Sequence, residues 1–372
     1  MLTHHHLLPA AHAGTQRQLR SLHFGLRQSG RKAYLQASLH ADEVPPMLVA
    51  QSLIHRLKAL EAAGAIAGEV VLVPLANPVG LSQDLQGSAL GRFDLATGVN
   101  FNRHFRHLAD EVARAVESRL GEDRAANTRL IRQALGEQLA AWQPATETEA
   151  LKRQLQWLAH DADLVLDLHC DNQAVVHLYV GTPQLEAARP LAGYLGAQAL
   201  LHTAVAGDEP FDETLARLWW ELAARFEGRH PVDPHGGVGV TVELRGETDV
   251  THALAEQDAD ALVAYLRQQG HVAGEPPPST PPCEATPLEG VEPVTAPCAG
   301  IVVFAKAPGD WVRQGELIAE IIDPLTDERT PLHARASGRC FARTARRYAS
   351  RGMRLAKIAG DQAWRSGKLL SL

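Results

Sequence analysis

Short apolar segments alternate with longer segments of helical periodicity along the first part of the chain. Residues 33–39, 69–75 and 163–168 have the length and composition of buried strands. Residues 47–64 and 253–270 carry apolar side chains at helical spacing. Strands that alternate with helices predict an α/β fold, with a mixed, mostly parallel sheet flanked by helices. The remaining expected elements are strands at 174–180 and 239–244 and helices within 108–160 and 213–228.

A Pro-rich stretch interrupts this pattern between residues 274 and 297. Proline resists both helices and central strands, so this stretch is interpreted as a linker or an extended crossing segment. The composition therefore predicts a domain over residues 1–273, a linker over 274–297 and a small all-β domain over 298–372.

The last region contains a weak internal repeat. Gly300 aligns with Gly338, and Ile321 aligns with Ile358 at nearly the same offset. Two similar all-β halves predict a small β-sandwich that resembles the lipoyl and biotinyl carrier fold. The tip between the halves, IIDPLTDERTP, contains no lysine to which a cofactor could be attached. We therefore expect a structural or lid domain and not a carrier.

The bulk properties exclude several classes of protein. The 372 residues carry a net charge of −7 without a basic stripe, so no nucleic acid partner is expected. No apolar run reaches membrane-spanning length, and the N-terminus lacks a secretory pattern. We expect a flexible N-terminus, a cytoplasmic protein and no membrane partner. The four scattered cysteines argue against a disulfide framework or a thiolate zinc cluster.

The sequence HADE places His40 and Glu43 three residues apart, after a predicted strand and before a predicted helix. Zinc accepts imidazole nitrogen and carboxylate oxygen, and catalytic zinc sites use three protein ligands. This pair is therefore a candidate for two of the ligands. The alternative is a surface loop with two solvated side chains.

The sequence DLVLDLH ends with Asp167 and His169 on the same face of a predicted strand. A hydrogen-bonded core histidine is the alternative interpretation. Active sites of open α/β sheets lie at the carboxyl ends of the strands, where both His40 and His169 are expected. This common location favours one shared site.

Two further segments carry polar residues next to apolar ones. Glu243 lies near the end of the strand GVTVEL, where it is either functional or paired with Arg245. The segment GRFDLATGVNFNR supplies Arg92, Asn102 and Arg103, and arginine binds carboxylates in a bidentate manner. Solvated arginines on a surface loop are the alternative.

In this order, the motifs resemble the succinylglutamate desuccinylase and aspartoacylase family of the zinc carboxypeptidase superfamily. The resemblance runs from QASLHADE through VPLANPVG, GRFDLATGVNFNR and DLHCD to VELRG, and so covers most of the chain. The chain departs from the family pattern at Ala41, where glycine is usual, and at Cys170. No tyrosine clearly matches the substrate-binding one of some members, and Tyr348 is the candidate.

The resemblance implies a role for each residue. His40, Glu43 and His169 look like the ligands of one Zn²⁺ per chain, and residues 1–273 look like a zinc hydrolase catalytic domain. Glu243 is similar to the general base that takes a proton from zinc-bound water. The remaining site residues are Asn102 and Arg103, which resemble a carboxylate clamp, and Arg92, which matches the arginine that polarises the scissile carbonyl. Apart from the resemblance, Asp167 is placed to orient His169 from behind the ligand.

The implied function is hydrolysis of the amide bond of an N-acyl amino acid, or of a similar small amide that carries a carboxylate. A metallocarboxypeptidase acting on peptides would use the same zinc and the same arginine clamp. A non-catalytic binding protein on the same fold is the alternative of another class, but it predicts the loss of a ligand or base, and none is lost. A homo-oligomer is compatible with the sequence. The acyl group, the amino acid and the exact metal stay open.

Overall fold

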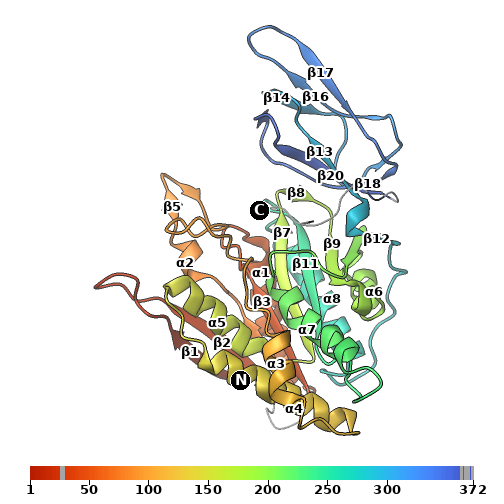
Figure 1. Ribbon diagram of the computed structural model, residues 1–372. Helices are drawn as coiled ribbons and strands as arrows, with labels where there is room; N and C mark the ends of the chain where they lie inside the picture. The colour runs from red at the N-terminus through yellow and green to blue at the C-terminus, as the bar shows by residue number, and fades with distance from the viewer. Residues whose placement is uncertain (26–29, 361–362, 364–368, 370–372) are drawn as a thin grey trace.

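The computed structural model describes residues 1–25, 30–360, 363 and 369. Figure 1 shows a large body in which helices flank a central sheet, with a smaller all-β body, strands β13 to β20, packed at one end of it. The predicted fold class is confirmed, both for the mixed α/β part and for the all-β part near the C-terminus.

A nine-stranded sheet forms the centre of the large body (Figure 1). Strands β4, β3, β7 and β11 are parallel neighbours, and so are β9, β10 and β12. The pairs β1–β2, β2–β4 and β11–β9 are antiparallel, so the sheet is mixed but mostly parallel. In spatial order the strands are β1 (Leu2–Leu7), β2 (Gln18–Gly25), β4 (Glu69–Val73), β3 (Lys32–Ala37), β7 (Leu164–Asp171), β11 (Val238–Gly246), β9 (His177–Gly181), β10 (Ala199–Thr203) and β12 (Ala285–Pro287).

Helices cover both faces of this sheet, because its central strands are apolar on both sides. On β7, Leu166 packs into one hydrophobic cluster with Leu53 and Leu262, whereas Val165 packs into another with Leu155. The helices of the first face are α1 (Pro45–Ala62), α6 (Leu185–Leu195) and α8 (His252–Gln268), and those of the second are α3 (Ala109–Val116), α4 (Arg124–Ala141), α5 (Glu147–Ala159) and α7 (Phe211–Arg225). No helix within the described residues is long and apolar enough to cross a membrane.

The N-terminal residues form an edge strand, so the expectation of a flexible terminus was wrong. Strand β1 pairs along its whole length with β2. His6 Nε2 lies 2.8 Å from Ser21 Oγ, and the rings of His4 and His23 are 4.7 Å apart. Because most side chains of β1 are exposed, its sequence carries no apolar alternation that would have indicated a strand.

Two antiparallel sheets form the small body and reproduce the internal repeat. One contains β13 (Val291–Thr295), β20 (Arg354–Gly360), β18 (Gly338–Arg343) and β15 (Trp311–Val312), and the other contains β17 (Arg329–His333), β16 (Leu317–Ile322), β14 (Gly300–Phe304) and β19 (Tyr348–Ala349). The aligned glycines Gly300 and Gly338 begin equivalent strands. A Cβ atom would lie 2.5 Å from Ile322 O at the first and 2.0 Å from Ala359 O at the second, so each half needs glycine there.

The Pro-rich segment starts as an extended crossing and ends in strands. Residues 276–284 contain no helix or strand, and Thr280 Oγ1 donates to Gly193 O at 2.6 Å as the chain passes α6. Strand β12 then joins the large sheet, and β13 joins the small one. Strand pairing thus begins inside the predicted linker, and the division into domains stays a prediction.

Candidate active site

His40 and Glu43 lie in the connection between β3 and α1. This connection folds back on itself, because Ser38 adopts a positive φ of 60° and its hydroxyl donates to Glu43 O at 2.7 Å. Gly91 packs against the same turn, where a Cβ atom would lie 2.3 Å from Asp42 N. Only a residue without a side chain can approach so closely, and this approach holds the turn in place.

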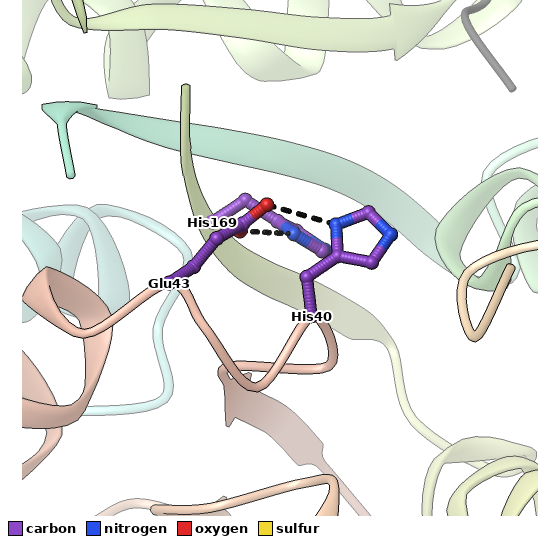
Figure 2. Close-up of side chains that lie close together, drawn as sticks. All are labelled: His40, Glu43 and His169. Carbon is purple, nitrogen blue, oxygen red and sulfur yellow. Dashed lines mark hydrogen bonds and ion pairs between the residues drawn. The ribbon is translucent and has the colours of Figure 1, made fainter. Parts of the chain in front are cut away.

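His169 comes from the carboxyl end of β7, the strand next to β3, and meets the pair from the β3–α1 connection (Figure 2). Each oxygen of Glu43 lies next to one imidazole, with Oε1 2.8 Å from His40 Nδ1 and Oε2 2.8 Å from His169 Nδ1. The three side chains are buried, and their ligand atoms all lie within 4.8 Å of one another. A cluster of two imidazoles and a carboxylate at this spacing could hold a metal ion.

Asn100 determines which nitrogen of His40 carries the proton. Its Oδ1 accepts the backbone N–H of Asn102 at 2.8 Å, and this bond establishes the orientation of the amide. His40 Nε2 lies 2.8 Å from the same oxygen and must therefore donate to it. In the neutral imidazole the lone pair is then on Nδ1, which faces the cluster.

Asp167 has the corresponding place beside His169. Its Oδ2 lies 2.9 Å from His169 Nε2, a close contact that lacks the alignment of a hydrogen bond. Gln36 Nε2 donates to the other oxygen of Asp167 at 2.9 Å. Each histidine of the cluster thus has an oxygen next to Nε2 and directs Nδ1 inward.

The electrostatics of the cluster favour a cation. Burial lowers the pKa of His40 to about 4, so this imidazole is neutral at pH 7. Burial acts to raise the pKa of Glu43, but His169 and His40 outweigh it, and the pKa lies well below its ordinary value. At His169 the effect of burial is opposed by Asp167 and Glu43, and the pKa is raised well above its ordinary value. Two carboxylates that stabilise a positive imidazole would equally stabilise a metal ion.

Glu243 lies beside the cluster on β11, where the backbone register sets it opposite His169. Within the described part of the chain, its buried Oε2 has no hydrogen-bond partner. Burial, followed by the charge of Glu43, raises the pKa of Glu243 to about 8. The ion pair with Arg245 does not form, because Arg245 binds Asp258 instead.

The three residues from the segment 91–103 all reach this site. Arg92 Nη1 lies 3.2 Å from His40 Nδ1 and 3.3 Å from Glu43 Oε1. Asn102 Nδ2 lies 3.4 Å from His169 Nε2, while its Oδ1 accepts the N–H of Phe211 at the start of α7. Arg103 Nη1 donates to Asn102 O at 2.6 Å, and the guanidinium is buried.

A cavity of about 430 Å³ opens over the cluster, and all seven predicted site residues line it: His40, Glu43, Arg92, Asn102, Arg103, His169 and Glu243. Its far wall comes from β18, β20 and the loops that follow β18 and precede β20, with Arg343, Met353 and Lys357 among the lining residues.

The chain matches the succinylglutamate desuccinylase/aspartoacylase catalytic domain over residues 29–268, more than half of its length. The chain belongs to this family. Members of the family are hydrolases, and the matched segment contains every residue of the His–Glu–His cluster and Glu243. No curated protein matches the chain.

Solved structures extend the family fold beyond the matched segment. A protein from Shewanella amazonensis, assigned to the same family, is 26% identical, with a TM-score of 0.86 over 96% of this chain and 98% of that one. The fold also matches a Shewanella frigidimarina protein at 24% identity, with a TM-score of 0.87 over 96% and 97% of the two chains. The product-bound ectoine utilization protein EutE from Ruegeria pomeroyi shares the fold at 18% identity, with a TM-score of 0.65 over 97% and 95%.

Some residues that support this site were not found from the sequence. Asn100 was missed, and so was Lys152 of α5, which is buried and donates to Arg103 O at 2.7 Å. Tyr348 was the candidate tyrosine, but it is 53% exposed and does not line the cavity, whereas Tyr179 of β9 does. The available signal for Asn100 was its position, since it is a polar residue two positions before the predicted site residue Asn102.

Proposed function

We propose that this family member is a zinc-dependent amidohydrolase that removes the acyl group from an N-acyl amino acid or a similar small amide with a carboxylate. The observation that carries the proposal is the convergence of two Nδ1 atoms and one carboxylate at the floor of a cavity that also contains Glu243. The family to which the chain belongs supports a reaction of this class.

The donor set fits zinc. Two imidazole nitrogens and one carboxylate oxygen make three protein ligands, the number found in catalytic zinc sites. Asn100 and Asp167 support ligation through Nδ1, since both occupy the Nε2 side of their histidines. Zinc, when bound, lowers the pKa of a coordinated water to about 7 and polarises a carbonyl oxygen.

Glu243 is the proposed general base. It lies on the strand next to His169, and its buried oxygen lacks a partner among the described residues, so it is available to a proton from water. It would accept a proton from the attacking water and later donate it to the departing amine. Arg92 is proposed to donate hydrogen bonds to the oxygen that becomes negative as the amide carbon turns tetrahedral.

Asn102 and Arg103 are proposed to bind the carboxylate of the substrate. Arg103 is buried, and burial lowers the pKa of its guanidinium to about 10, so the group remains charged at pH 7 without full solvation. The carboxylate of a substrate would form charge-assisted hydrogen bonds with the guanidinium, in place of those that water makes with an exposed arginine. The wall supplied by β18 and β20 limits the cavity to about 430 Å³, which favours small amides over long peptides.

The experiment measures the release of primary amine from N-acetyl, N-succinyl and N-formyl amino acids and from short peptides. Three samples are compared: the chain loaded with zinc, the same chain after chelation, and the zinc-loaded E243Q variant. The matched control is E256Q, the same change at an exposed position of α8.

We expect release from one or more N-acyl amino acids, dependent on zinc, lost in E243Q and kept in E256Q. Release that survives chelation would contradict the zinc assignment. Zinc binding with turnover of peptides alone would reassign the chain as a metallocarboxypeptidase. A chain that neither binds zinc nor turns over any substrate would refute the proposal and leave the non-catalytic alternative.

A further inference from the structure

Residues 171–174, which begin two positions after His169, all contact the small all-β body. Asp171 pairs with Lys357, and Asn172 Oδ1 accepts the N–H of Ala345 at 3.4 Å. Gln173 and Ala174 form strand β8, which pairs antiparallel with β18. The segment 171–174 thus leaves the strand that carries His169 and passes directly into a sheet of the other body.

Side chains reinforce this strand pairing. Arg343 Nε and Arg347 Nη2 both donate to Gln173 Oε1, at 2.8 and 2.9 Å. The N–H of Val175 donates to Phe341 O at 3.0 Å, which continues the pairing by one residue. Because hydrogen bonds from two bodies meet on this short segment, its position depends on the small body and not only on β7.

Lys357 makes the one ion pair of this attachment among the described residues. It comes from β20, and its Nζ lies 2.5 Å from Oδ2 of Asp171, the last residue of β7. The two side chains are 26% and 20% exposed, so solvent screens the pair only in part. The other oxygen of Asp171 accepts the N–H of Asn172 at 2.8 Å.

The ion pair also balances charge within the cavity. Seven carboxylates line it, among them those of Glu43, Asp171 and Glu243, and Lys357 is one of the six lysine and arginine side chains of the lining. Asp171 pairs in register with Gly246 of β11, so it lies where the strand of His169 meets the strand of Glu243. Without the lysine, the Asp171 carboxylate would be partly buried and uncompensated, and it would gain by moving toward water.

We propose that Lys357 is a positioning residue of the active site: by compensating the charge of Asp171, it keeps the end of β7 in place and thereby maintains the relative positions of His169 and Glu243. This proposal rests on the proposed function in one respect, since a change in kcat can be measured only if the chain is the proposed hydrolase. A displacement of about 1 Å at reacting groups can reduce the rate about a hundredfold, so loss of this pair should appear mainly in kcat.

The test compares K357M with the double variant K357M/D171N, which removes the pair without leaving an unbalanced carboxylate. The control is K306M, because Lys306 pairs with Glu316 inside the small body, 3.0 Å away. The measurements are kcat, KM, zinc content, thermal unfolding, and hydrogen exchange of residues 169–175 by mass spectrometry.

We expect K357M to lose about tenfold or more in kcat, with KM within about threefold and one zinc per chain retained. Hydrogen exchange of residues 169–175 should accelerate, the double variant should recover kcat to within about threefold of wild type, and K306M should match wild type. If K357M does not fold, K357Q is judged by the same criteria.

Two results would overturn the proposal: K357M that matches wild type in both kcat and exchange, or a double variant as impaired as K357M although folded. The exchange readout does not need turnover. An inactive wild type with faster exchange in K357M would therefore refute the proposed function while supporting the positioning role.

Discussion

His40 and His169 direct the same ring nitrogen, Nδ1, toward the single carboxylate of Glu43. Each Nδ1 lies 2.8 Å from one oxygen of that carboxylate. The common orientation is set from behind the rings, where each Nε2 faces an oxygen of a different residue, 2.8 Å away for His40 and 2.9 Å away for His169. The site is therefore arranged for a cation by residues that would not touch it.

The first prediction concerns Asn100, which holds His40 from behind. Replacing Asn100 by alanine removes the acceptor of Nε2 and should weaken zinc binding about 10- to 100-fold. Competition with a chromogenic chelator measures this change directly. Asn127→Ala is the control, because Asn127 bonds Gly121 O and Pro231 O away from the site. Equal zinc affinity in Asn100→Ala and wild type would contradict the role of Asn100.

The second prediction concerns Gly91, which packs against the turn that carries His40 and Glu43. A Cβ atom at residue 91 would lie only 2.3 Å from the backbone nitrogen of Asp42, so the backbone there would have to move. Overpacking of this kind costs about 1–3 kcal/mol, so Gly91→Ala should weaken zinc binding about tenfold or more. Gly121→Ala is the matched control, since a Cβ atom there meets nothing within 4 Å. Isothermal titration should separate the two variants, and the same affinity in both would disprove the packing argument.

The third prediction concerns Arg103 and the carboxylate of the substrate. Arg103→Ala should reduce kcat/KM about 30-fold or more, which corresponds to about 2 kcal/mol, because a buried charged contact is lost. The loss should largely disappear when the substrate carboxylate is replaced by an amide. The exposed neighbour Arg106 is the control, and Arg106→Ala should change neither value. Equal losses for the acid and the amide would place the carboxylate elsewhere.

The fourth prediction follows from the pKa of Lys152, which supports the backbone of Arg103. Burial lowers this pKa to about 8, whereas the unfolded chain has the ordinary value of 10.5. Between these values the unfolded state binds more protons, so this lysine makes stability increase as the pH rises from 8 to 10.5. The contribution is about 3 kcal/mol over the full interval.

Urea unfolding of wild type and K152M at several pH values tests this sign. The difference in unfolding free energy, wild type minus K152M, should rise between pH 8 and 10.5 and stay flat from pH 6 to 7.5. Titration of other groups cancels in the difference. A difference that falls with pH, or does not change, would show that folding does not lower the pKa of Lys152.

Much of the fold follows from local patterns. The apolar runs on β3, β4 and β7 are buried on both sides, which is why their strand character is readable from composition alone. The repeat around Gly300 and Gly338 is equally visible, because both positions exclude a side chain. Strand β1 was missed, since an exposed edge strand needs only backbone pairing.

Most of the site could be predicted from the polar residues at the ends of the central strands. Contacts between residues far apart in the sequence could not be predicted. His40, His169 and Glu243 each follow or end an apolar strand, so the topology alone suggests that they meet. Asn100 is 60 residues from His40, and Lys357 is 186 residues from Asp171. No local pattern links residues at such distances, and their roles depend on how loops and the small body pack.

The most direct test of zinc-dependent hydrolysis is a titration of the metal-free chain with zinc, with amine release measured at each step on an N-acyl amino acid that the loaded chain turns over. We expect the rate to rise linearly with added zinc and to stop rising at one zinc per chain. A rate that is already present without metal, or that does not increase as zinc binds, would contradict zinc-dependent hydrolysis.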